Sequence, residues 1–571
     1  MYCLCNCLLA LHEKRLYLLM KILSFFFLIC FFVSCSSSSP SKVIETSKGK
    51  LQGYEENQVN FFLGIPYAEA PLGDLRWQPP KPIKSWEGIK NVDRLGSACM
   101  QPTNIGNSAF LDLMLDGYGL AWYEKLVIKS LSFFAPRLSA SNFSEDCLFL
   151  NVIAPENAEN LPVMFWIHGG AGRFGSGGDA IYLTSKFAKK DVILVTINYR
   201  LGSLGWFAHP ALSAESEAGV SGNYASLDQI EALNWVKNNI SNFGGDPNNV
   251  TIFGESAGGQ AVGTLLSSPL SKGLFHKAIS QSGSGILGTR SLRDNSRNRS
   301  AEDIGLELAE YFGVDNNEKA LENLRKIPAE EFIQISDSEK DANLISNVTQ
   351  IVDGYVFPYM FNEAYRNGTT HNVPYITGFN ANEGTTLVPL IFPEPIFEAS
   401  FSGEDWLDEF WEILLDGFSG EVPEPVTDYV NSMEGSDYDA AAQVWGDIWF
   451  GGPAYYSAQK RSDDGLKTYL YFFERAVPSE KQTIGATHAL ELAYIFGSFF
   501  PFVARDDWDE ELSEIMLNDW TEFAKTGIPN DSWPEFSSEQ PTARIYGDSV
   551  YEGKLKDYKV FEALADYFNK F

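Results

Sequence analysis

The chain has 571 residues, of which 44% are hydrophobic and 21% are charged. This composition is typical of a folded globular protein and excludes a disordered or fibrous chain. Lys and Arg number 43 against 75 Asp and Glu, giving a net charge of −32; this excludes nucleic acid and anionic membrane surfaces as partners, because both are bound through Lys and Arg.

The N-terminal segment has the pattern of an export signal. Residues 20–35 combine Lys21 with an apolar stretch that is too short to span a membrane. The stretch ends in Phe-Val-Ser-Cys, which resembles the lipobox of bacterial lipoproteins, with Cys35 as the lipidated first residue of the mature chain. The alternative is ordinary secretory cleavage near Ser34, which leaves Cys35 free.

This pattern sets the expected limits of the folded chain. We take Met20 as the start and residues 1–19 as a spurious extension, so that residues 1–35 form the leader. A serine-rich tether, residues 36–41, then opens a single domain that covers residues 36–571.

The cysteines agree with export. Five of the seven lie in the leader, which leaves Cys99 and Cys147. A lone pair in an exported protein most simply forms a disulfide. The sequence has no His-Glu-x-x-His motif and no paired Cys-x-x-Cys motifs, so we expect neither a metal nor a cofactor.

Apolar and helical stretches alternate along the rest of the chain. Residues 163–167, 192–197 and 250–253 are almost continuously apolar, as is typical of strands covered on both faces of a parallel sheet. Residues 227–240 carry apolar side chains at helical spacing, and Gly-Gly-Asp-Pro ends this helix. With no internal repeat and no clear linker, we predict one large α/β domain with a mostly parallel central sheet and helices on both faces.

The sequence Gly-Glu-Ser-Ala-Gly at 254–258 is the strongest indication of chemistry. It follows a predicted strand and begins a helix of small and apolar residues over 257–266. A Gly-x-Ser-x-Gly motif between a strand and a helix is typical of a nucleophile elbow, which exposes the serine at the edge of the sheet. We therefore predict Ser256 as the nucleophile.

A serine nucleophile needs a general base, normally a histidine held by a carboxylate. In this type of fold the chain order is serine, acid, histidine. Position excludes five of the six histidines: His12, His168, His209, His276 and His371. His488, which follows the predicted strand 469–473, remains as the base.

The acid must lie between the serine and this histidine, after a strand. Glu383 follows the apolar segment 375–377 and fits. Asp353 is the second candidate, although its Asp-Gly sequence is typical of a turn. The alternative interpretation of Glu383 is that it is an ordinary carboxylate of a surface loop and not the acid of the triad.

The segment 168–171 supplies the expected oxyanion hole. His-Gly-Gly-Ala follows a buried strand and offers two consecutive backbone N–H groups, and the N–H of Ala257 offers a third. We expect His168 to pack beneath this loop rather than to take part in catalysis.

These motifs together resemble the type-B carboxylesterase/cholinesterase family of α/β-hydrolases over essentially the whole mature chain. The matching segments are FLGIPYA (62–68), PLGDLRW (71–77), SEDCLFLNV (144–152), WIHGG (166–170), NYRLG (198–202), NFGGDP (242–247), TIFGESAGG (251–259), GATH (485–488) and residues 520–530. The resemblance implies an α/β-hydrolase fold and hydrolysis of carboxylic esters without a cofactor.

The resemblance also implies roles for particular residues. The triad is Ser256, Glu383 and His488, and the oxyanion donors are the N–H groups of Gly170, Ala171 and Ala257. The family pattern pairs Cys99 with Cys147, and it suggests an ion pair between Arg76 and Glu145.

The sequence departs from the family pattern in three places. Ala171 replaces a glycine, and Gly172 replaces a common aromatic residue. The segment between Cys99 and Cys147 is longer than usual and has apolar patches at 110–115 and 121–128, which form either a lid over the pocket or peripheral packing helices. The tryptophan that binds choline in cholinesterases has no clear counterpart, so we do not predict a cholinesterase.

We therefore expect an exported serine esterase, a bacterial lipoprotein of the outer membrane, periplasm or cell surface, attached to the membrane only through Cys35. The alternative is a non-catalytic binding or adhesion protein on the same fold. The strongly negative chain and Glu255 beside the nucleophile favour neutral esters, with Arg173 as the one nearby cation. Activity should rise with pH through one ionisation near the ordinary histidine pKa of about 6.5.

Overall fold

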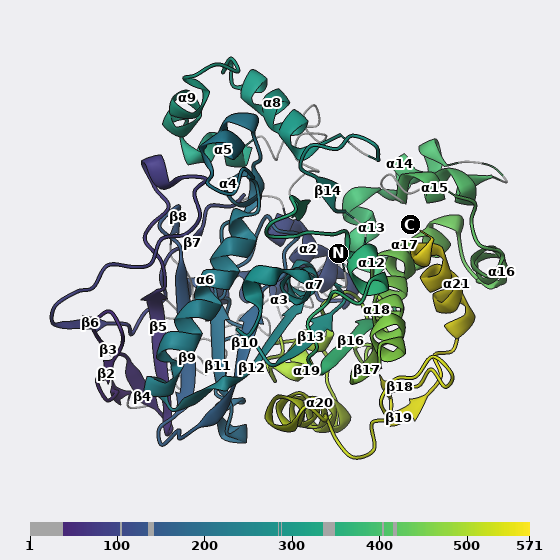
Figure 1. Cartoon of the computed structure of the whole chain (residues 1–571). Helices are drawn as coiled ribbons and strands as arrows, with labels where there is room; N and C mark the ends of the chain where they lie inside the picture. Colours follow the sequence, from purple (N-terminus) through teal and green to yellow (C-terminus); the bar gives the residue numbers. More distant parts are fainter. Residues whose placement is uncertain are drawn as a thin grey trace, which may run out of the picture.

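The computed structural model describes residues 38–102, 106–134, 142–283, 285–286, 288–297, 299–334, 349–401, 403, 405–414 and 420–570. The predicted leader, with Cys35, lies outside these residues. Figure 1 shows a single body in which helices surround a central sheet. The predicted α/β architecture is confirmed.

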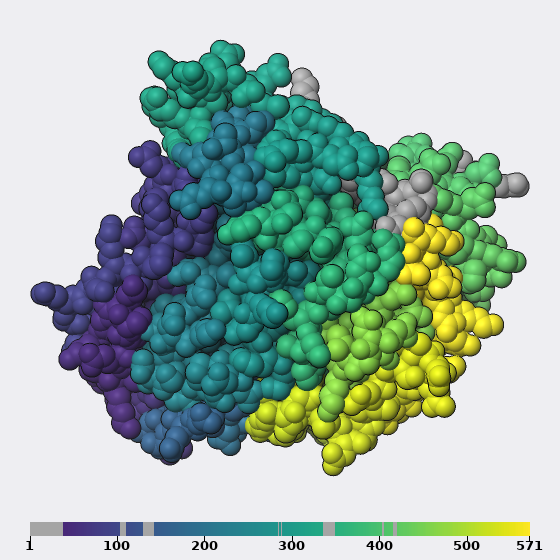
Figure 2. All heavy atoms as spheres, viewed as in Figure 1, coloured from purple at the N-terminus to yellow at the C-terminus, as the bar shows by residue number. Residues whose placement is uncertain are grey.

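The central sheet has twelve strands within the described residues. In spatial order they are β1 (Ser39–Pro40), β4 (Tyr54–Glu56), β5 (Val59–Pro66), β9 (Phe149–Pro155), β11 (Ile193–Ile197), β10 (Leu161–Ile167), β12 (Gly245–Glu255), β13 (Lys277–Gln281), β16 (Tyr375–Asn380), β17 (Thr468–Phe473), β18 (Ala543–Tyr546) and β19 (Val550–Gly553). The strands from β11 to β18 are parallel to their neighbours, and antiparallel strands complete both edges. Figure 2 accordingly shows the N-terminal part (purple) and the C-terminal part (yellow) on opposite sides of the molecule.

The strands predicted at 163–167, 192–197 and 250–253 are β10, β11 and the last part of β12. One expectation needs correction, because the serine-rich tether is shorter than predicted. Ser39–Pro40 forms edge strand β1, which pairs with β4.

In the part of the chain that the structure describes, three short sheets accompany the main one. The first contains β2 (Ile44–Glu45), β3 (Lys50–Gln52) and β6 (Ile89–Asn91), the second β7 (Ala98–Cys99) and β8 (Phe143–Ser144), and the third β14 (Arg290–Ser291) and β15 (Ile351–Val352). The α-helices are α2 (Gly106–Gly117), α3 (Trp122–Phe134), α4 (Gly202–Trp206), α5 (Pro210–Glu215), α6 (Tyr224–Asn239), α7 (Ala257–Ser267), α8 (Ala301–Tyr311), α9 (Ala320–Lys326), α10 (Ala329–Gln334), α12 (Phe361–Arg366), α13 (Gly384–Ile391), α14 (Glu394–Ser400), α15 (Trp406–Leu414), α16 (Glu424–Ser432), α17 (Asp437–Gly446), α18 (Gly452–Asp463), α19 (Glu491–Ile495), α20 (Asp507–Thr526) and α21 (Tyr558–Asn569). Across the described ranges, none of these helices has both the length and the apolar surface needed to cross a bilayer.

Strand β10 shows why the sheet needs helices on both faces. Successive side chains of a strand point to opposite faces. Val163 and Phe165 join a core formed with α6 and α7, whereas Met164 and Trp166 join a second core formed with α19 and α20. All four side chains are buried, so the continuous apolar sequence of this strand is a direct consequence of its position.

A third core lies at the C-terminal edge of the sheet, on the right in Figure 1, where α18 and α21 pack together.

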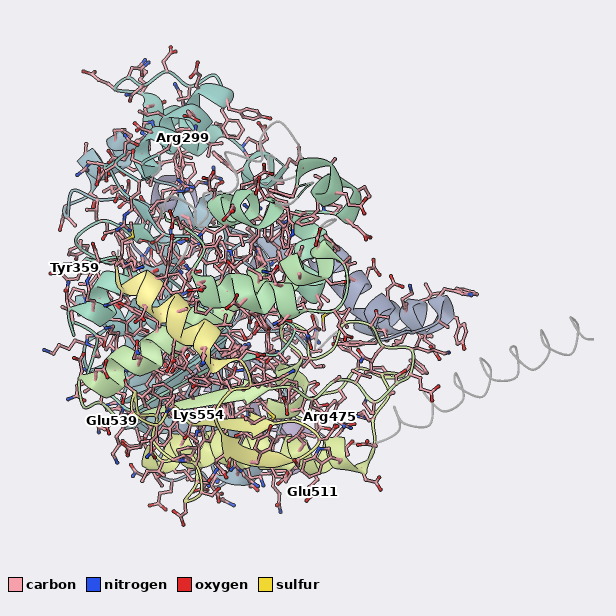
Figure 3. All side chains as sticks on the ribbon, turned by 90° about the vertical axis from the view of Figure 1, so that its right-hand side faces the viewer. Arg299, Tyr359, Arg475, Glu511, Glu539 and Lys554 are labelled. Atoms are coloured by element: carbon pink, nitrogen blue, oxygen red, sulfur yellow. A yellow bond between two sulfur atoms is a disulfide. The ribbon has the colours of Figure 1, made fainter. Side chains whose placement is uncertain are left out.

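A buried cation also connects separate elements near this edge of the sheet. Arg475, labelled in Figure 3, follows β17 and forms ion pairs with Asp506 and Asp509 at 2.8 Å and with Asp548 at 2.5 Å. One guanidinium thus joins the start of α20 to the β18–β19 turn.

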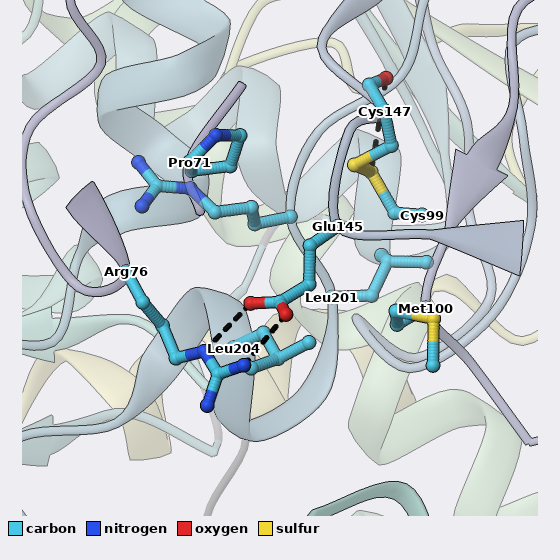
Figure 4. A pocket seen from close by; sticks show the side chains of 9 residues that line it. Pro71, Arg76, Cys99, Met100, Glu145, Cys147, Leu201 and Leu204 are labelled. Carbon is cyan, nitrogen blue, oxygen red and sulfur yellow. Dashed lines mark hydrogen bonds and ion pairs between the residues drawn. A yellow bond between two sulfur atoms is a disulfide. The ribbon is translucent and has the colours of Figure 1, made fainter. Parts of the chain in front are cut away.

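The two contacts implied by the resemblance near the N-terminus are present. Cys99 and Cys147 form a disulfide, and the guanidinium of Arg76 donates two hydrogen bonds of 2.6 Å to Glu145 (Figure 4). Arg76 also donates to the carbonyl of Ile327. Both ends of the long 99–147 segment are therefore attached to the body of the protein.

This disulfide should make a measurable contribution to stability. In the chain-entropy model, closing a loop with a sequence separation of 48 residues stabilises the fold by about 4 kcal/mol. We expect the double variant Cys99→Ser/Cys147→Ser to unfold at clearly lower urea concentration than the wild type. Reductant should lower the wild-type midpoint to a similar value without affecting the double variant; an equal midpoint in the oxidised wild type and the double variant would contradict the prediction.

Candidate active site

Ser256 lies in a strained turn between β12 and α7. Its backbone has φ 56° and ψ −124°, a conformation that residues other than glycine rarely adopt and that is frequent at functional sites. The turn is held by a hydrogen bond of 2.9 Å from the N–H of Ser256 to the carbonyl of Gln281 on β13. This is the geometry of the nucleophile elbow that the sequence predicts.

The two glycines of the motif let helix α7 cross the sheet closely. A Cβ atom on Gly258 would lie 2.0 Å from the carbonyl oxygen of Ile167 on β10, and one on Gly254 would lie 2.5 Å from the backbone of Gly258. Side chains at either position would force α7 away from the strands. The motif therefore sets the position of Ser256 through backbone packing.

The turn after β10 brings backbone donors close to the serine. A Cβ atom on Gly169 would lie 3.2 Å from Ser256 Cβ, so this turn and the elbow are in contact. Within the described residues, the N–H groups of Gly170, Ala171 and Ala257 donate no hydrogen bond. Three unoccupied donors next to a serine are suited to stabilise an oxyanion.

His168 supports this turn. Its ring stacks on Tyr199 with 4.4 Å between ring centroids, and Tyr199 donates a hydrogen bond of 2.7 Å to the His168 carbonyl. Burial lowers the pKa of His168 to about 4, so the ring is neutral at pH 7. These contacts give it the structural role that we expected.

His488 and Glu383 meet at the carboxyl ends of β16 and β17. His488 Nδ1 lies 2.5 Å from Glu383 Oε2, and the two residues are only 4% and 2% exposed. The other oxygen of Glu383 accepts hydrogen bonds from the N–H of Asn380, at 2.7 Å, and from the hydroxyl of Ser282, at 2.6 Å. Glu383 is therefore a buried, oriented carboxylate rather than a surface one.

The second candidate for the acid, Asp353, has a different task. One of its oxygens accepts hydrogen bonds from the backbone N–H groups of Tyr355, Val356 and Phe357. Its other oxygen accepts one from the Asn223 side chain. Asp353 thus stabilises a turn, as its Asp-Gly sequence indicates.

The far side of the imidazole faces Glu255. His488 Nε2 lies 3.0 Å from Glu255 Oε1, while Ser256 Oγ makes no hydrogen bond within the described part of the chain. The sequence analysis noted Glu255 only as a charge beside the nucleophile. Its contact with His488 could not be deduced from the motif, because it depends on the rotamer that Glu255 adopts.

A third carboxylate completes the surroundings of His488. Glu491 accepts hydrogen bonds from Asn380, at 2.6 Å, and from Gln281, at 3.0 Å. Burial raises the pKa of Glu255 to about 8 and that of Glu491 to about 7. The sequence analysis missed Glu491 and Ser282; their positions, just after His488 and after the strand next to the elbow, were the available indications.

These charges act on the histidine. Burial on its own would lower the pKa of His488, but Glu255 and then Glu383 outweigh it and raise this pKa to about 9. The structure therefore moves the expected ionisation of His488, the predicted base, above the ordinary histidine value of about 6.5.

Two aromatic rings enclose the imidazole. Phe450 stacks on it with 4.7 Å between centroids, and Phe110 approaches edge-on at 6.4 Å. Phe450 belongs to the π-helical turn Asp447–Gly451 between α17 and α18, and Phe110 belongs to α2. Helix α2, the first helix of the long 99–147 segment, is thus a wall of the site.

The second helix of that segment, α3, has a different character. Its Trp122 and Leu126 are 69% and 58% exposed. The sequence offered a lid or peripheral packing as alternatives for both apolar patches. The structure separates them, because α2 reaches the imidazole while α3 exposes these side chains on the surface.

The remaining described histidines lie elsewhere and have structural contacts. His209 caps α5, His276 accepts a hydrogen bond from the N–H of Val250, and His371 contacts Ser271 and the carbonyl of Ser268. None of these contacts involves the elbow, so the elimination made from the sequence agrees with where these rings lie.

Known proteins share this architecture. The family model described as "Carboxylesterase family" matches residues 40–558. The para-nitrobenzyl esterase of Bacillus subtilis is 33% identical over 526 residues, which cover 89% of this chain and 95% of that protein. Carboxylesterase 1C of Mus musculus is 31% identical over 550 residues, with 91% and 92% covered.

A solved structure agrees with these sequence matches. The carboxylesterase of Geobacillus stearothermophilus, in its structure at pH 6.2, superposes with a TM-score of 0.74 at 31% identity, covering 91% of this chain and 99% of that one. The chain therefore belongs to the carboxylesterase family of α/β-hydrolases, and it is a serine hydrolase of carboxylic esters.

Proposed function

We propose that this esterase is an exported lipoprotein that hydrolyses neutral carboxylic esters through an acyl-enzyme intermediate. Ser256 is the nucleophile, His488 the general base, and Glu383 the acid that orients the imidazole. The observation that carries the proposal is the buried contact between His488 Nδ1 and Glu383 Oε2. The other imidazole nitrogen, Nε2, faces Glu255, the residue directly before Ser256.

The proposed reaction follows from these positions. Ser256 Oγ attacks the ester carbonyl while His488 Nε2 takes its proton, and the N–H groups of Gly170, Ala171 and Ala257 stabilise the negative oxygen. The tetrahedral intermediate then breaks its bond to the alcohol oxygen, which receives the proton from His488. Water, activated by the same imidazole, releases the acid and restores Ser256.

One adjustment precedes the first step. His488 Nε2 lies 3.0 Å from Glu255 Oε1, which makes no hydrogen bond within the described residues, and the hydrogen bond from Ser256 Oγ to Nε2 has to form when substrate binds. Catalytic hydrogen bonds are often poorly aligned before substrate binds.

The preference for neutral esters rests on charge. Glu255, Glu383 and Glu491 are all buried around the imidazole, and the chain as a whole carries a net charge of −32. The buried carboxylates and the negative net charge both disfavour the binding of an ester that carries an anionic group near its leaving alcohol.

Export as a lipoprotein rests on the leader sequence and on the disulfide. The leader ends in the lipobox-like sequence at Cys35, and Cys99 and Cys147 form a disulfide. Disulfides persist mainly in oxidising compartments outside the cytosol.

The nucleophile can be tested by covalent labelling. A fluorophosphonate probe should label the wild type and should not label Ser256→Ala, because only an activated serine reacts. Ser256→Ala and His488→Ala should each lower kcat by about 10⁴-fold or more, and Glu383→Gln by less. Ser267→Ala, a buried serine on the same helix, should label normally; full labelling of Ser256→Ala would disprove the assignment.

The pH profile tests the surroundings of His488. Only the neutral imidazole acts as a base, so kcat/KM should rise with pH through an apparent pKa above 6.5. Glu255→Gln removes the carboxylate that contributes most to raising this pKa, and the ascending limb should move to lower pH. Glu302→Gln, a buried carboxylate that binds Arg293 instead, is the control and should leave the limb in place; an unchanged limb in Glu255→Gln would refute the proposed coupling.

The lipid anchor depends on a single sulfur atom. Cys35→Ser should move the protein from the membrane fraction to the soluble periplasmic or secreted fraction and leave esterase activity intact, because the acyl chains are attached at this residue. Fractionation followed by immunoblotting measures this. If the variant remains in the membrane fraction, the anchor is not at Cys35.

A further inference from the structure

A π-helical turn lies beside the imidazole of His488, between α17 and α18 on the right in Figure 1. It covers Asp447–Gly451 and continues directly from one helix into the next. Such turns are rare, their hydrogen bonds span one residue more than those of an α-helix, and they are frequent at functional sites. The wider turn changes the direction of the side chains that it carries. One of these is Phe450, whose ring contacts the predicted base.

Two glycines allow the turn to lie close to its neighbours. A Cβ atom on Gly446, just before the turn, would lie 2.8 Å from the Cβ atom of Glu383. A Cβ atom on Gly451, the last residue of the turn, would lie 2.5 Å from the ring of Phe561 on α21. Side chains at these two positions would therefore push the turn away. The turn is packed tightly between the predicted acid and α21.

Hydrogen bonds attach the same turn to the loop of the predicted acid. Gln443 Nε2 donates one to the carbonyl of Ala381, at 3.0 Å, and one to the carboxyl group of Asp447, at 3.3 Å. Ala381 lies two residues before Glu383. The acid and the turn that carries Phe450 are thus held by a common side chain, and the position of one depends on that of the other.

The face of the Phe450 ring covers the face of the imidazole. The ring centroids are 4.7 Å apart and the ring planes differ by 26°. The two residues are only 8% and 4% exposed. A contact on the face leaves the nitrogens, which bind partners in the plane of the imidazole, accessible, and Nδ1 meets Glu383 there at 2.5 Å. The stacked ring thus restricts rotation of the imidazole out of the plane that suits this contact.

The stacked ring also acts on charge. The face of an aromatic ring carries partial negative charge and attracts a cation that lies within about 6 Å of the ring centroid. In the proposed mechanism the imidazole becomes an imidazolium when it takes the proton of Ser256. At 4.7 Å, Phe450 lies within this range, so its ring stabilises the charged form of His488 more than the neutral form.

Other charged groups also face the imidazole. Among the described residues they include three buried carboxylates, on β12, after β16 and at the start of α19: Glu255, Glu383 and Glu491. Asp447, an acid on the same turn as Phe450, accepts a hydrogen bond from Gln443 instead. A test of Phe450 therefore has to leave these carboxylates unchanged and alter only the ring.

We propose that Phe450 is a positioning residue for the base. Its ring face holds the imidazole of His488 in the plane in which Nδ1 meets Glu383, and it stabilises the imidazolium that forms when Ser256 loses its proton. The inference rests on the proposed esterase mechanism and adds to it a role for the π-helical turn.

The first test changes the charge distribution of this ring and nearly preserves its shape. Phe450 is replaced by 3,4,5-trifluorophenylalanine, in which fluorine withdraws electron density from the ring face, and kcat/KM for a neutral ester is measured across the pH range. Because the imidazolium loses stabilisation, the apparent pKa of the ascending limb should fall by about half a unit, and kcat/KM on the plateau should fall about threefold.

A second variant tests the orientation of the imidazole. Phe450→Leu keeps an apolar side chain but has no ring face to stack on His488. Because Phe450 acts through the base, kcat should fall about tenfold while KM changes by less than about threefold. A rise in KM with kcat unchanged would show that Phe450 only binds substrate, and it would overturn the proposal.

The controls separate the possible failures. The same analogue at Phe243, which packs edge-on against Phe62 in the core that the sheet forms with α6, should leave the pH profile unchanged. An apparent pKa that stays or rises in the Phe450 analogue, or an equal shift in both analogues, overturns the proposal; Phe450→Leu decides if the analogue does not fold. Hydrolysis by Ser256→Ala at the wild-type rate would instead overturn the proposed triad.

Discussion

The close passage of helix α7 across the end of strand β10 is the constraint on which the rest of the site depends. Gly258 has no room for a side chain against the Ile167 carbonyl, and this contact sets the sharp turn that places Ser256 at the edge of the sheet. The same strand end begins the turn that carries Gly170 and Ala171. The close approach of α7 to the end of β10 and the positive φ angles of Gly170 and Ala171 in the turn thus together place the predicted nucleophile beside the predicted oxyanion donors.

The electrostatics around His488 involve two opposing requirements. In the proposed mechanism an imidazolium forms at His488, where the carboxylates of Glu383 and Glu255 would stabilise it. The carboxylates of Glu255 and Glu383 also raise the pKa of His488 to about 9 and so reduce the fraction of neutral imidazole at lower pH. Burial opposes this increase, and the raised pKa of Glu255 reduces its own charge. The pKa values of His488 and Glu255 therefore depend on each other, and a pH profile reports on both groups.

The sequence predicted those parts of the site that depend on chain order and local turns. The elbow, the position of Glu383 after β16 and that of His488 after β17 follow from strand ends, which meet at one edge of a parallel sheet. The contacts of Glu255, Glu491, Phe450 and Phe110 with or around the imidazole depend on side-chain rotamers and on the packing of distant helices, which no local pattern encodes. For the same reason the sequence left the 99–147 segment undecided between a lid and a packing element, whereas the structure assigns α2 and α3 to different surroundings.

The two sides of the nucleophile present different chemistry to a substrate. On the histidine side, buried carboxylates and the rings of Phe110 and Phe450 surround His488, an environment that suits a neutral leaving alcohol with apolar surface in the proposed mechanism. On the side of the predicted oxyanion donors, the small residues Ala171, Gly172 and Ala257 lie beside the neutral side chains of Trp206 and Gln229. In the proposed mechanism the leaving alcohol faces α2 and the α17–α18 turn, whereas Ser256 is held by the contact of α7 with β10. Substitutions in α2 and in that turn should therefore change the selectivity for the alcohol while Ser256 keeps its position.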